Sequence, residues 1–477
     1  MTFEQLQIKQ LQAENEQLKQ IIKTMAATIE QQAKKIAELE ARLKQNSKNS
    51  SKPPSSDGLR KPAAKRTISG KKRGGQSGHA GVHLSVTCEP DEVIQHFPVE
   101  CEGCPNVSKC LKNAACISEK RNVVDMVVEV VVSEHQALEF TCPRRGSQTL
   151  KGCFPENISA SVQYGENLTA FAVALNTIGM VSVNRTHDIM SNMFNIPIST
   201  GTISNMVERC ADSVTDTVIE IRDKVIVSDV AHFDETGTRV EGKTMWVHNS
   251  STEKLTYLTV HPKRGKDGMD DNGVLPSFRG NAVHDCWASY WKYFATHVLC
   301  NAHILRELTG IVENRPEQVW AQGMIDLLLE MKQARDNAVR NDETCLFDGI
   351  LGKFSSRYDL IIEQGRALNP LPPDESGKRG RKAKGKVRAL VDRLAEHKGA
   401  VCLFARDFKI PFDNNQAERD IRMVKTKTKV SGCFRSKSGA DNFAKIMSYI
   451  GTAKKLGINT FEAVKNAVTG NADAVWT

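Results

Sequence analysis

Three carboxylate residues stand in settings that suit metal-assisted chemistry. Asp234 lies in the run VSDVAHFDETGTR, Asp285 in GNAVHDCWASYW, and Glu418 in PFDNNQAERDIRMVK. Two divalent ions about 4 Å apart can align a water or a 3′-hydroxyl with a phosphodiester when carboxylates from separate elements hold them. Mg²⁺ keeps several waters, so few protein carboxylates suffice. The trio indicates phosphoryl transfer on DNA with two Mg²⁺ or Mn²⁺ ions, although any one of the three alone could be an ordinary solvated or capping carboxylate.

The first two carboxylates are predicted to stand at strand ends. The runs IVSDVAHF and GNAVHDC are short, apolar and rich in β-branched residues, which favours strands that end near Asp234 and Asp285. The stretch between these two residues is long enough for two more strands and a helix. The stretch from Asp285 to Glu418 is too long for a simple crossover, so we expect an insertion there.

A helix is predicted to carry the third carboxylate. Asn414 or Asn415 is a suitable N-cap, which places Glu418 in the first turns. Basic residues near the carboxylates are candidate contacts to the DNA backbone, although such residues on a helix usually form a solvated face. These candidates are Arg239, Arg419, Arg422 and Lys425.

The motifs DET, HDC, CNAH and DNNQAER resemble those of the insertion-sequence-66 family of bacterial transposases. The segments NSKNSSKPPSSDG, GGQSGHAG and YIGTAKKLGINTFEAV, with a cysteine cluster, extend the resemblance over nearly the whole chain. It implies a ribonuclease-H-like α/β catalytic core whose Asp-Asp-Glu triad is Asp234, Asp285 and Glu418. It also implies that Cys300 and His303, a Cys-x-x-His pair, shape the site without binding the catalytic metal. The alternative for this pair is a buried cysteine and a satisfied histidine at a strand-to-helix junction.

A cysteine cluster follows the pattern of a small zinc ribbon, in which a Cys-x-x-Cys knuckle is closed by thiolates after a hairpin. The run NVVDMVVEVVVSEHQALEF alternates and predicts two strands that would bring Cys142 opposite the knuckle. The family that the chain resembles often has a second Cys-x-x-Cys knuckle, but Arg145 stands where that fourth ligand would be. We expect Cys110 to replace it, with Cys116 or Cys153 as alternatives. Reduced cysteines in a small β domain are the other interpretation. The predicted ligands of a structural Zn²⁺ are Cys101, Cys104, Cys110 and Cys142.

The amino-terminal region has a heptad pattern with isoleucine at the first seam position and leucine at the second, which favours a parallel dimeric coiled coil. Asn15 at the seam fixes the register, and Gln32 weakens the middle. A single amphipathic helix packed on the body is the alternative. The seam residues are Ile8, Leu11, Asn15, Leu18, Ile22, Met25, Ile29, Gln32, Ile36, Leu39 and Leu43.

A basic stretch rich in serine, proline and glycine follows the heptads and cannot bury enough apolar surface to fold alone. We interpret it as a flexible linker that either neutralises DNA phosphates or is a solvated tether. Its candidate DNA contacts are Lys71, Lys72 and Arg73. A second basic run at 377–388 either contacts the DNA backbone or forms a loop.

These patterns predict a multidomain α+β protein. The segment RTHDIMSNMFNIPISTGTISNMVERCADSV predicts two helices joined by a short turn, which resembles a helix-turn-helix but also fits an ordinary helical hairpin. The expected parts are a coiled coil (1–45), the basic linker (46–84), a cysteine-rich zinc-binding-like domain (85–160), a helix-turn-helix-like segment (161–225), the catalytic core (226–304 and 399–435), a helical insertion (305–398) and a carboxyl-terminal helical segment (436–477).

Composition suits a cytoplasmic multidomain protein. The chain has 477 residues, 40% of them hydrophobic, and a formal net charge of +9. No apolar run reaches the roughly 18 residues of a membrane span, and the first residues lack a secretory signal. The thirteen cysteines therefore suggest reduced thiols with one possible metal cluster.

The combined prediction is a DNA transposase that cleaves the ends of an insertion sequence and joins the 3′-hydroxyl to target DNA. Its expected partners are double-stranded DNA, a second copy of the chain, and accessory proteins encoded by the same element. The alternatives are a catalytically inactive zinc-containing DNA-binding regulator and a ribonuclease-H-like nuclease without strand transfer.

Overall fold

The computed structural model describes residues 3–43, 89–94, 96, 101, 103–106, 108–110, 120–142, 144, 148–371 and 384–477. The chain divides into two compact units, one made of Met1–Leu59 with Pro155–Thr477 and the other of Arg60–Phe154. The expected linker at 46–84, with Lys71, Lys72 and Arg73, lies outside the described residues, as does most of the basic run at 377–388.

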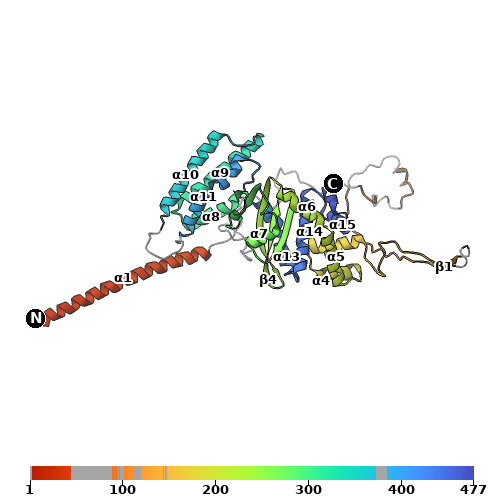
Figure 1. The fold of residues 1–477 in the computed structure, drawn as a ribbon, viewed down its shortest axis with the longest axis horizontal. Coiled ribbons are helices and arrows are strands. Elements are labelled where there is room, and N and C mark those ends of the chain that lie inside the picture. The colour runs from red at the N-terminus through yellow and green to blue at the C-terminus, as the bar shows by residue number, and fades with distance from the viewer. Residues whose placement is uncertain are drawn as a thin grey trace. The chain divides into compact units, whose positions relative to one another are not determined.

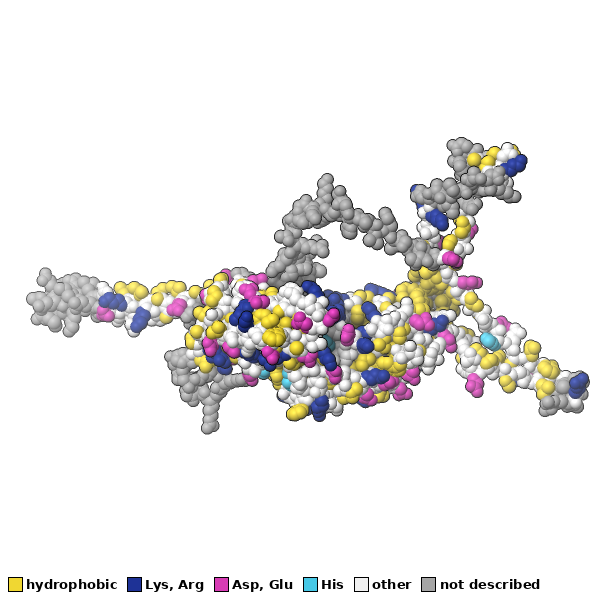
Figure 2. Space-filling model, turned by 90° about the horizontal axis from the view of Figure 1, so that it is seen from above, with side chains coloured by type: hydrophobic (Ala, Val, Ile, Leu, Met, Phe, Trp, Pro, Cys, Tyr) yellow, Lys and Arg dark blue, Asp and Glu magenta, His cyan; other side chains and the backbone are white. Residues whose placement is uncertain are grey.

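The heptad region forms one long helix, α1, Phe3–Leu43. Its apolar seam is uncovered: Ile22 is 65% exposed and Ile29 is 62% exposed. Figure 2 shows hydrophobic side chains along the arm that this helix forms. Burial of such a stripe is what a second helix would provide.

The Arg60–Phe154 unit contains a short antiparallel hairpin. Strand β1, Glu139–Cys142, pairs with β2, Gln148–Lys151, so that Cys142 lies opposite Gln148. The two strands expected in 122–140 differ from this arrangement, because residues 120–138 are described without strand pairing and Val123 is 93% exposed. Alternating apolar residues show which side chains would share one face of a strand. A strand also needs a partner that hydrogen-bonds to its backbone N–H and C=O groups.

Four helices fill the segment that was expected to be helical at 161–225. They are α3 (Glu166–Thr177), α4 (Val183–Phe194), α5 (Thr200–Ser213) and α6 (Thr215–Ile226). Ser182 and Ser199 cap α4 and α5, since each hydroxyl accepts a backbone N–H three residues on. Asn195 ends α4 in the left-handed region, with a φ of 53°, which turns the chain toward α5.

The unit that contains Pro155–Thr477 is built on a five-stranded mixed sheet in the order β5-β4-β3-β6-β7. Its strands are β3 (Val230–Val240), β4 (Lys243–Ser251), β5 (Thr256–His261), β6 (Asn281–His284) and β7 (Thr296–Leu299). The pairs β5-β4 and β4-β3 are antiparallel, whereas β3-β6 and β6-β7 are parallel. Two strands and the helix α7, Lys266–Asn272, lie between Asp234 and Asp285, which confirms the prediction from spacing.

Helices cover both faces of this sheet. Helices α13 (Asn415–Ser431) and α14 (Lys437–Lys455) pack on β3, β4 and β5, with α15 (Thr460–Val468) beyond them. Helices α6 and α7 contact β4 and β5, and a second apolar cluster contains Phe233 and Phe278. The periodicity of two in β3 explains this division, because Phe233 points to that cluster while His232 bonds to the residue that precedes α13.

A helical lobe stands between the second and third carboxylates. It contains α8 (Asn301–Asn314), α9 (Val319–Arg340), α10 (Asp348–Leu368), α11 (Lys386–Glu396) and α12 (Lys398–Arg406). The labelled helices α8 to α11 gather together in Figure 1. Trp320, which is fully buried, lies in an apolar cluster that continues to Phe412. The helical packing therefore begins before the expected limit at 305 and extends past the one at 398.

The lobe leaves and rejoins the sheet at neighbouring points, which we call its neck. The thiol of Cys300, directly after β7, accepts a hydrogen bond from the backbone N–H of Asn414 at 3.1 Å. The N–H of Asn301 donates to the carbonyl of Phe412, also at 3.1 Å. Among the helices that the structure describes, none is long and apolar enough to cross a membrane.

Candidate active site

Adjacent strands, β3 and β6, position Asp234 and Asp285, but the two residues occupy different places relative to the strand ends. Asp285 directly follows β6, as expected. Asp234 lies within β3 rather than at its end, which corrects the prediction from the sequence. The reason is that β6 pairs only with Val230–His232, whereas the hairpin with β4 carries β3 on to Val240.

Helix α13 brings Glu418 to the same face as Asp234. Asp234 is paired with Asn249 on β4, and paired residues point to the same side of a sheet. The Asn249 amide donates to the carbonyl of Ala417 at 3.3 Å, so the first turn of α13 lies on that side.

The charges of Asp285 and Glu418 both act on the carboxyl group of Asp234. The pKa of Asp234 is raised well above its ordinary value, first by burial and then by the negative charges of Glu235, Asp285 and Glu418. Nearby negative charges disfavour the ionised form of the Asp234 carboxyl group. Asp285 and Glu418 thus lie close enough to Asp234 for their charges to act on its carboxyl group.

Two basic side chains of α8 face the third carboxylate. His303 Nε2 lies 3.8 Å from Glu418 Oε1, and Arg306 Nη2 lies 3.4 Å from the same oxygen. Burial lowers the pKa of His303, and the positive charge of Arg306 lowers it further, against the opposing effect of the Glu418 carboxylate. The other ring nitrogen of His303 is buried and has no hydrogen-bond partner among the residues that are described.

Cys300 is buried at the junction of β7 and α8. Burial raises the pKa of its thiol to about 12, so the sulfur stays protonated near neutral pH. The thiol accepts the backbone N–H of Asn414, at 3.1 Å, and that of His303, and it contacts no carboxylate among the described residues. In this structure Cys300 belongs to the neck and His303 to the surroundings of Glu418.

The turn after β6 fixes the second carboxylate. Asp285 Oδ1 accepts the N–H of Trp287 at 2.9 Å, and the N–H of Cys286 donates to His284 Nδ1 at 3.1 Å. Cys286 has a φ of 72°, a left-handed conformation that is strained for a side chain with a Cβ atom. The strained residue, Cys286, thus directly follows Asp285, whose carboxylate is held by the backbone of the same turn.

An ion pair between the buried Glu235 and the partly exposed Arg264 lies next to Asp234. The carboxylate of Glu235 accepts hydrogen bonds from Arg264 Nε at 2.7 Å and from the Tyr290 hydroxyl at 2.6 Å. The Arg264 guanidinium lies over the rings of Trp246 and Trp287, at 5.1 and 4.3 Å from their centroids. The only clue in the sequence is an acidic residue next to Asp234 in a buried strand. This network ties β3 to the turn that carries Asp285.

The chemistry of the three carboxylates suits a hard divalent cation. All are oxygen donors, and their mutual repulsion at Asp234 is what a bound cation would offset. In the described part of the chain, no group of three or more His, Cys, Asp or Glu side chains is arranged to hold a metal ion. Arg306 meanwhile holds Glu418. The donor type fits Mg²⁺ or Mn²⁺, and the structure shows no closed ligand set for either ion among these residues.

The predicted zinc ligands are only partly described. Cys101, Cys104 and Cys110 are free thiols, of which the last two are exposed. Cys142 lies in β1, and its side chain is outside the described residues. Cys153 is also free and exposed.

The predicted DNA-binding side chains differ in their surroundings. Arg419 and Arg422 are exposed on α13. Lys425 instead donates to the carbonyl of Gly237 at 2.6 Å, and burial lowers its pKa. Arg239 is exposed at the far end of β3, five residues and thus about 16 Å along the strand from Asp234.

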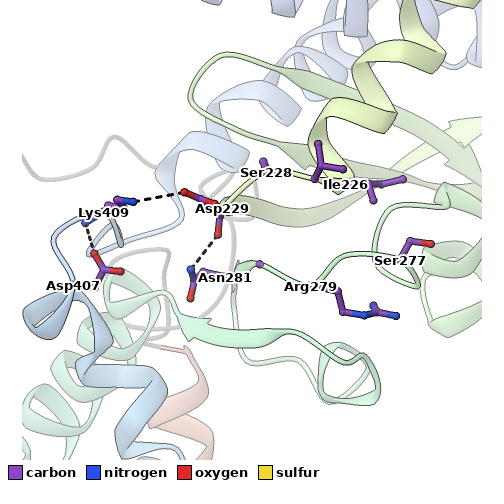
Figure 3. Close-up of a pocket in the computed structure, with 10 residues that line it drawn as sticks. Ile226, Ser228, Asp229, Ser277, Arg279, Asn281, Asp407 and Lys409 are labelled. Carbon is purple, nitrogen blue, oxygen red and sulfur yellow. Dashed lines mark hydrogen bonds and ion pairs between the residues drawn. The ribbon is translucent and has the colours of Figure 1, made fainter.

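A polar pocket of about 580 Å³ lies at the other end of the sheet. Figure 3 shows Asp229 between Lys409, whose Nζ is 3.7 Å away, and Asn281, whose amide donates to the Asp229 carbonyl at 3.0 Å. Asp229 precedes β3 and Asn281 begins β6, whereas Asp285 follows the carboxyl end of β6. The pocket is therefore separate from the carboxylates.

Comparison with known protein families agrees with this geometry. The model described as Transposase IS66 family matches residues 161–442, more than half of the chain and a range that includes all three carboxylates. A model described as a family of unknown function, DUF6444, matches residues 2–85. No curated protein matches the chain.

Proposed function

The chain belongs to the IS66 family of transposases, and on this premise we propose that it cleaves the ends of an insertion sequence and joins the freed 3′-hydroxyl to target DNA. The observation that carries the proposal is the approach of Asp234, Asp285 and Glu418 to one another from three separate elements. In this proposal they hold two Mg²⁺ or Mn²⁺ ions.

The fold supports this assignment. We interpret the sheet as a ribonuclease-H-like core, in which three antiparallel strands are followed by two parallel strands on the other side of β3. The helical lobe is then an insertion between the second and third catalytic carboxylates. Asp234 on the central strand, Asp285 on its neighbour and Glu418 on α13 would form the active site.

The residues of the chain hold the reacting groups in place. When bound, the two ions supply activation of the attacking oxygen and neutralise charge that develops on the phosphate. His303 and Arg306 orient Glu418, while the Glu235 network fixes the segments that carry the two aspartates. Arg419 and Arg422, exposed one turn apart, face outward where they can contact the DNA backbone.

We assign supporting roles to the remaining parts. The exposed apolar seam of α1 pairs with a second copy of the chain, which suits an enzyme that must hold two DNA ends. The basic linker, with Lys71, Lys72 and Arg73, adds salt-dependent contacts to phosphates. Cys101, Cys104, Cys110 and Cys142 hold a structural Zn²⁺.

The test is Mn²⁺-dependent nicking and joining of labelled DNA that carries the ends of the element. Neighbouring proteins encoded by the element are added where the transposase needs them. We expect the parent to join 3′-ends and the joining rate of the Glu418→Gln variant to fall about 10²-fold or more, because it lacks one proposed ligand of the metal ions that stabilise the reacting charge. Glu462→Gln, the same change on the remote helix α15, should behave as the parent does.

Two other outcomes would replace the proposal. If the parent and Glu418→Gln are equally inactive while both bind the ends, the protein is a DNA-binding regulator. If the parent nicks but never joins a 3′-end to target DNA, it is a nuclease without strand transfer.

A further inference from the structure

Asn414 precedes α13 and is buried, with 1% of its surface exposed. The sequence predicts a helix cap at Asn414 or Asn415, yet the Asn414 side chain makes no capping hydrogen bond. Its Oδ1 instead lies 2.8 Å from His232 Nδ1, and its Nδ2 donates to the carbonyl of Phe233 at 2.8 Å. Both bonds go to β3, two residues or fewer before Asp234.

The backbone of the same residue joins two more segments. Its N–H donates to the thiol of Cys300 at the neck, and its carbonyl accepts the N–H of Glu418 at 3.3 Å. Asn414 therefore contacts β3, the junction before α8, and the first turn of α13. These segments carry Asp234, His303 and Glu418.

Helix α13 and strand β3 rise by similar distances after Asn414 and His232. Glu418 is four residues after Asn414, about 6 Å along a helix, and Asp234 is two residues after His232, about 6.6 Å along a strand. His232 and Asp234 point to the same face of the sheet because side chains alternate. Asn414 and His232 are in contact, and the two segments rise by nearly the same distance after them. Glu418 therefore lies beside Asp234.

Contacts farther along show that α13 and β3 run in the same direction. Lys425 donates to the carbonyl of Gly237, and the hydroxyls of Thr428 and Thr238 lie 3.5 Å apart. These contacts hold the later turns of the helix. Close to the carboxylates, the amide of Asn414 and the hydrogen bond from the Asn249 amide to the Ala417 carbonyl hold the first turn of α13 on the sheet.

We propose that Asn414 is a positioning residue that sets Glu418 opposite Asp234 by bonding to β3 and the Cys300 thiol at once. This inference rests on the proposed function, because it concerns the carboxylates of that site. Residues that orient metal-binding side chains typically change metal affinity or activity about 10- to 100-fold when they are replaced.

The test compares Asn414→Ala and Asn414→Asp with the matched control Asn415→Ala, in the full chain. Asn415 is the next residue, and its backbone N–H donates to Asp413 Oδ1 at 3.0 Å, a hydrogen bond that alanine keeps. Mn²⁺ affinity is measured by titration calorimetry, joining kinetics give kcat and KM for end DNA, and amide hydrogen exchange reports the first turn of α13.

For Asn414→Ala we expect Mn²⁺ affinity and kcat to fall about 10- to 100-fold. The KM for DNA should stay within about two-fold of the parent, because the bulk of DNA binding lies elsewhere. Exchange in the first turn of α13 should accelerate. Asn414→Asp should resemble the alanine variant, because it keeps an acceptor for His232 but places a carboxylate oxygen against the Phe233 carbonyl. Asn415→Ala should match the parent in every measurement.

Parent-like Mn²⁺ affinity, kcat and hydrogen exchange in a folded Asn414→Ala protein would overturn the proposal. If neither Asn414 variant folds, Cys300→Ala decides, since it removes the thiol that accepts the N–H groups of Asn414 and His303 and keeps the Asn414 side chain; a parent-like result there also overturns the proposal. If the parent itself joins no DNA but exchange in α13 still accelerates in Asn414→Ala, the proposed function fails while the placement of Glu418 stands. If the parent joins DNA and Asn414→Ala matches it in every measurement, the proposed function stands and the placement of Glu418 by Asn414 fails.

Discussion

Arg306 donates a hydrogen bond to Glu418 at 3.4 Å, although 112 positions separate the two residues in the sequence. Both side chains are about a quarter exposed, at 24% and 26%. The contact links the first helix of the lobe to the helix that follows the lobe. The third carboxylate is therefore oriented by the lobe as well as by the sheet.

Arg306→Met should lower Mn²⁺-dependent nicking about 10-fold, because Glu418 loses the cation that fixes its orientation. DNA binding should change little. The matched control is Arg315→Met, an exposed arginine directly after the same helix. Equal nicking rates for the parent and Arg306→Met would show that Glu418 needs no such partner.

Tyr290→Phe should lower the free energy of unfolding by about 1–3 kcal/mol, because the buried Glu235 carboxylate would lose a hydrogen bond that water cannot replace. The control is Tyr293→Phe: its hydroxyl donates to Asp270 at 2.8 Å, but that carboxylate is 37% exposed and water can take over. Urea unfolding followed by tryptophan fluorescence compares the two. A loss for Tyr293→Phe as large as that for Tyr290→Phe would contradict the prediction.

Lys427 should make stability depend on pH in the alkaline range. Burial lowers its pKa from 10.5 to about 8, and its ammonium group donates to the carbonyl of Asn176 at 2.7 Å. Between these two values the unfolded chain binds more protons than the folded chain, so stability should rise with pH by up to about 3 kcal/mol. Below about pH 8 both states hold the proton, and the cost of burying the charge remains.

The measurement is the urea midpoint at pH 7.5 and pH 9.5 for the parent, Lys427→Met and the exposed control Lys429→Met. The parent and Lys429→Met should gain stability relative to Lys427→Met as the pH rises. Parallel pH profiles for all three proteins would rule out the titration of Lys427 as the cause.

Ile22→Lys combined with Ile29→Lys should convert a dimer into a monomer, because two charges would enter the apolar seam of α1. Sedimentation equilibrium measures the mass directly. Gln20→Lys with Ala27→Lys places the same charges on the opposite side of the helix and should leave the dimer intact. A parent that sediments as a monomer would remove the assigned role of α1.

The sequence predicted the elements around the candidate carboxylates better than it predicted the contacts that hold them. Asp234, Asp285 and Glu418 stand in distinctive motifs, and their spacing predicted the intervening strands and helix. The position of Asp234 inside β3 was missed because an apolar run marks where a strand is buried, whereas hairpin pairing decides how far it continues. Local patterns contain no information about that partner.

Contacts between distant segments could not be predicted for a related reason. Arg264, Tyr290, Arg306 and Asn414 act through residues far away in the sequence, and no spacing rule connects them. Asn414 is instructive, since its type and position suggested a helix cap. Tertiary packing instead offered its amide two partners on β3, which outcompeted the local capping bond.

The neck makes the lobe a modular attachment. Because Cys300 and Asn414 are in contact, a chain that omitted everything between them would need only a short connection to keep both carboxylate-bearing segments in place. Related enzymes could thus exchange this lobe for a larger, smaller or differently charged one without rebuilding the site. The exception is Glu418, whose Arg306 partner would be lost with the lobe, so each replacement would have to supply its own counter-charge.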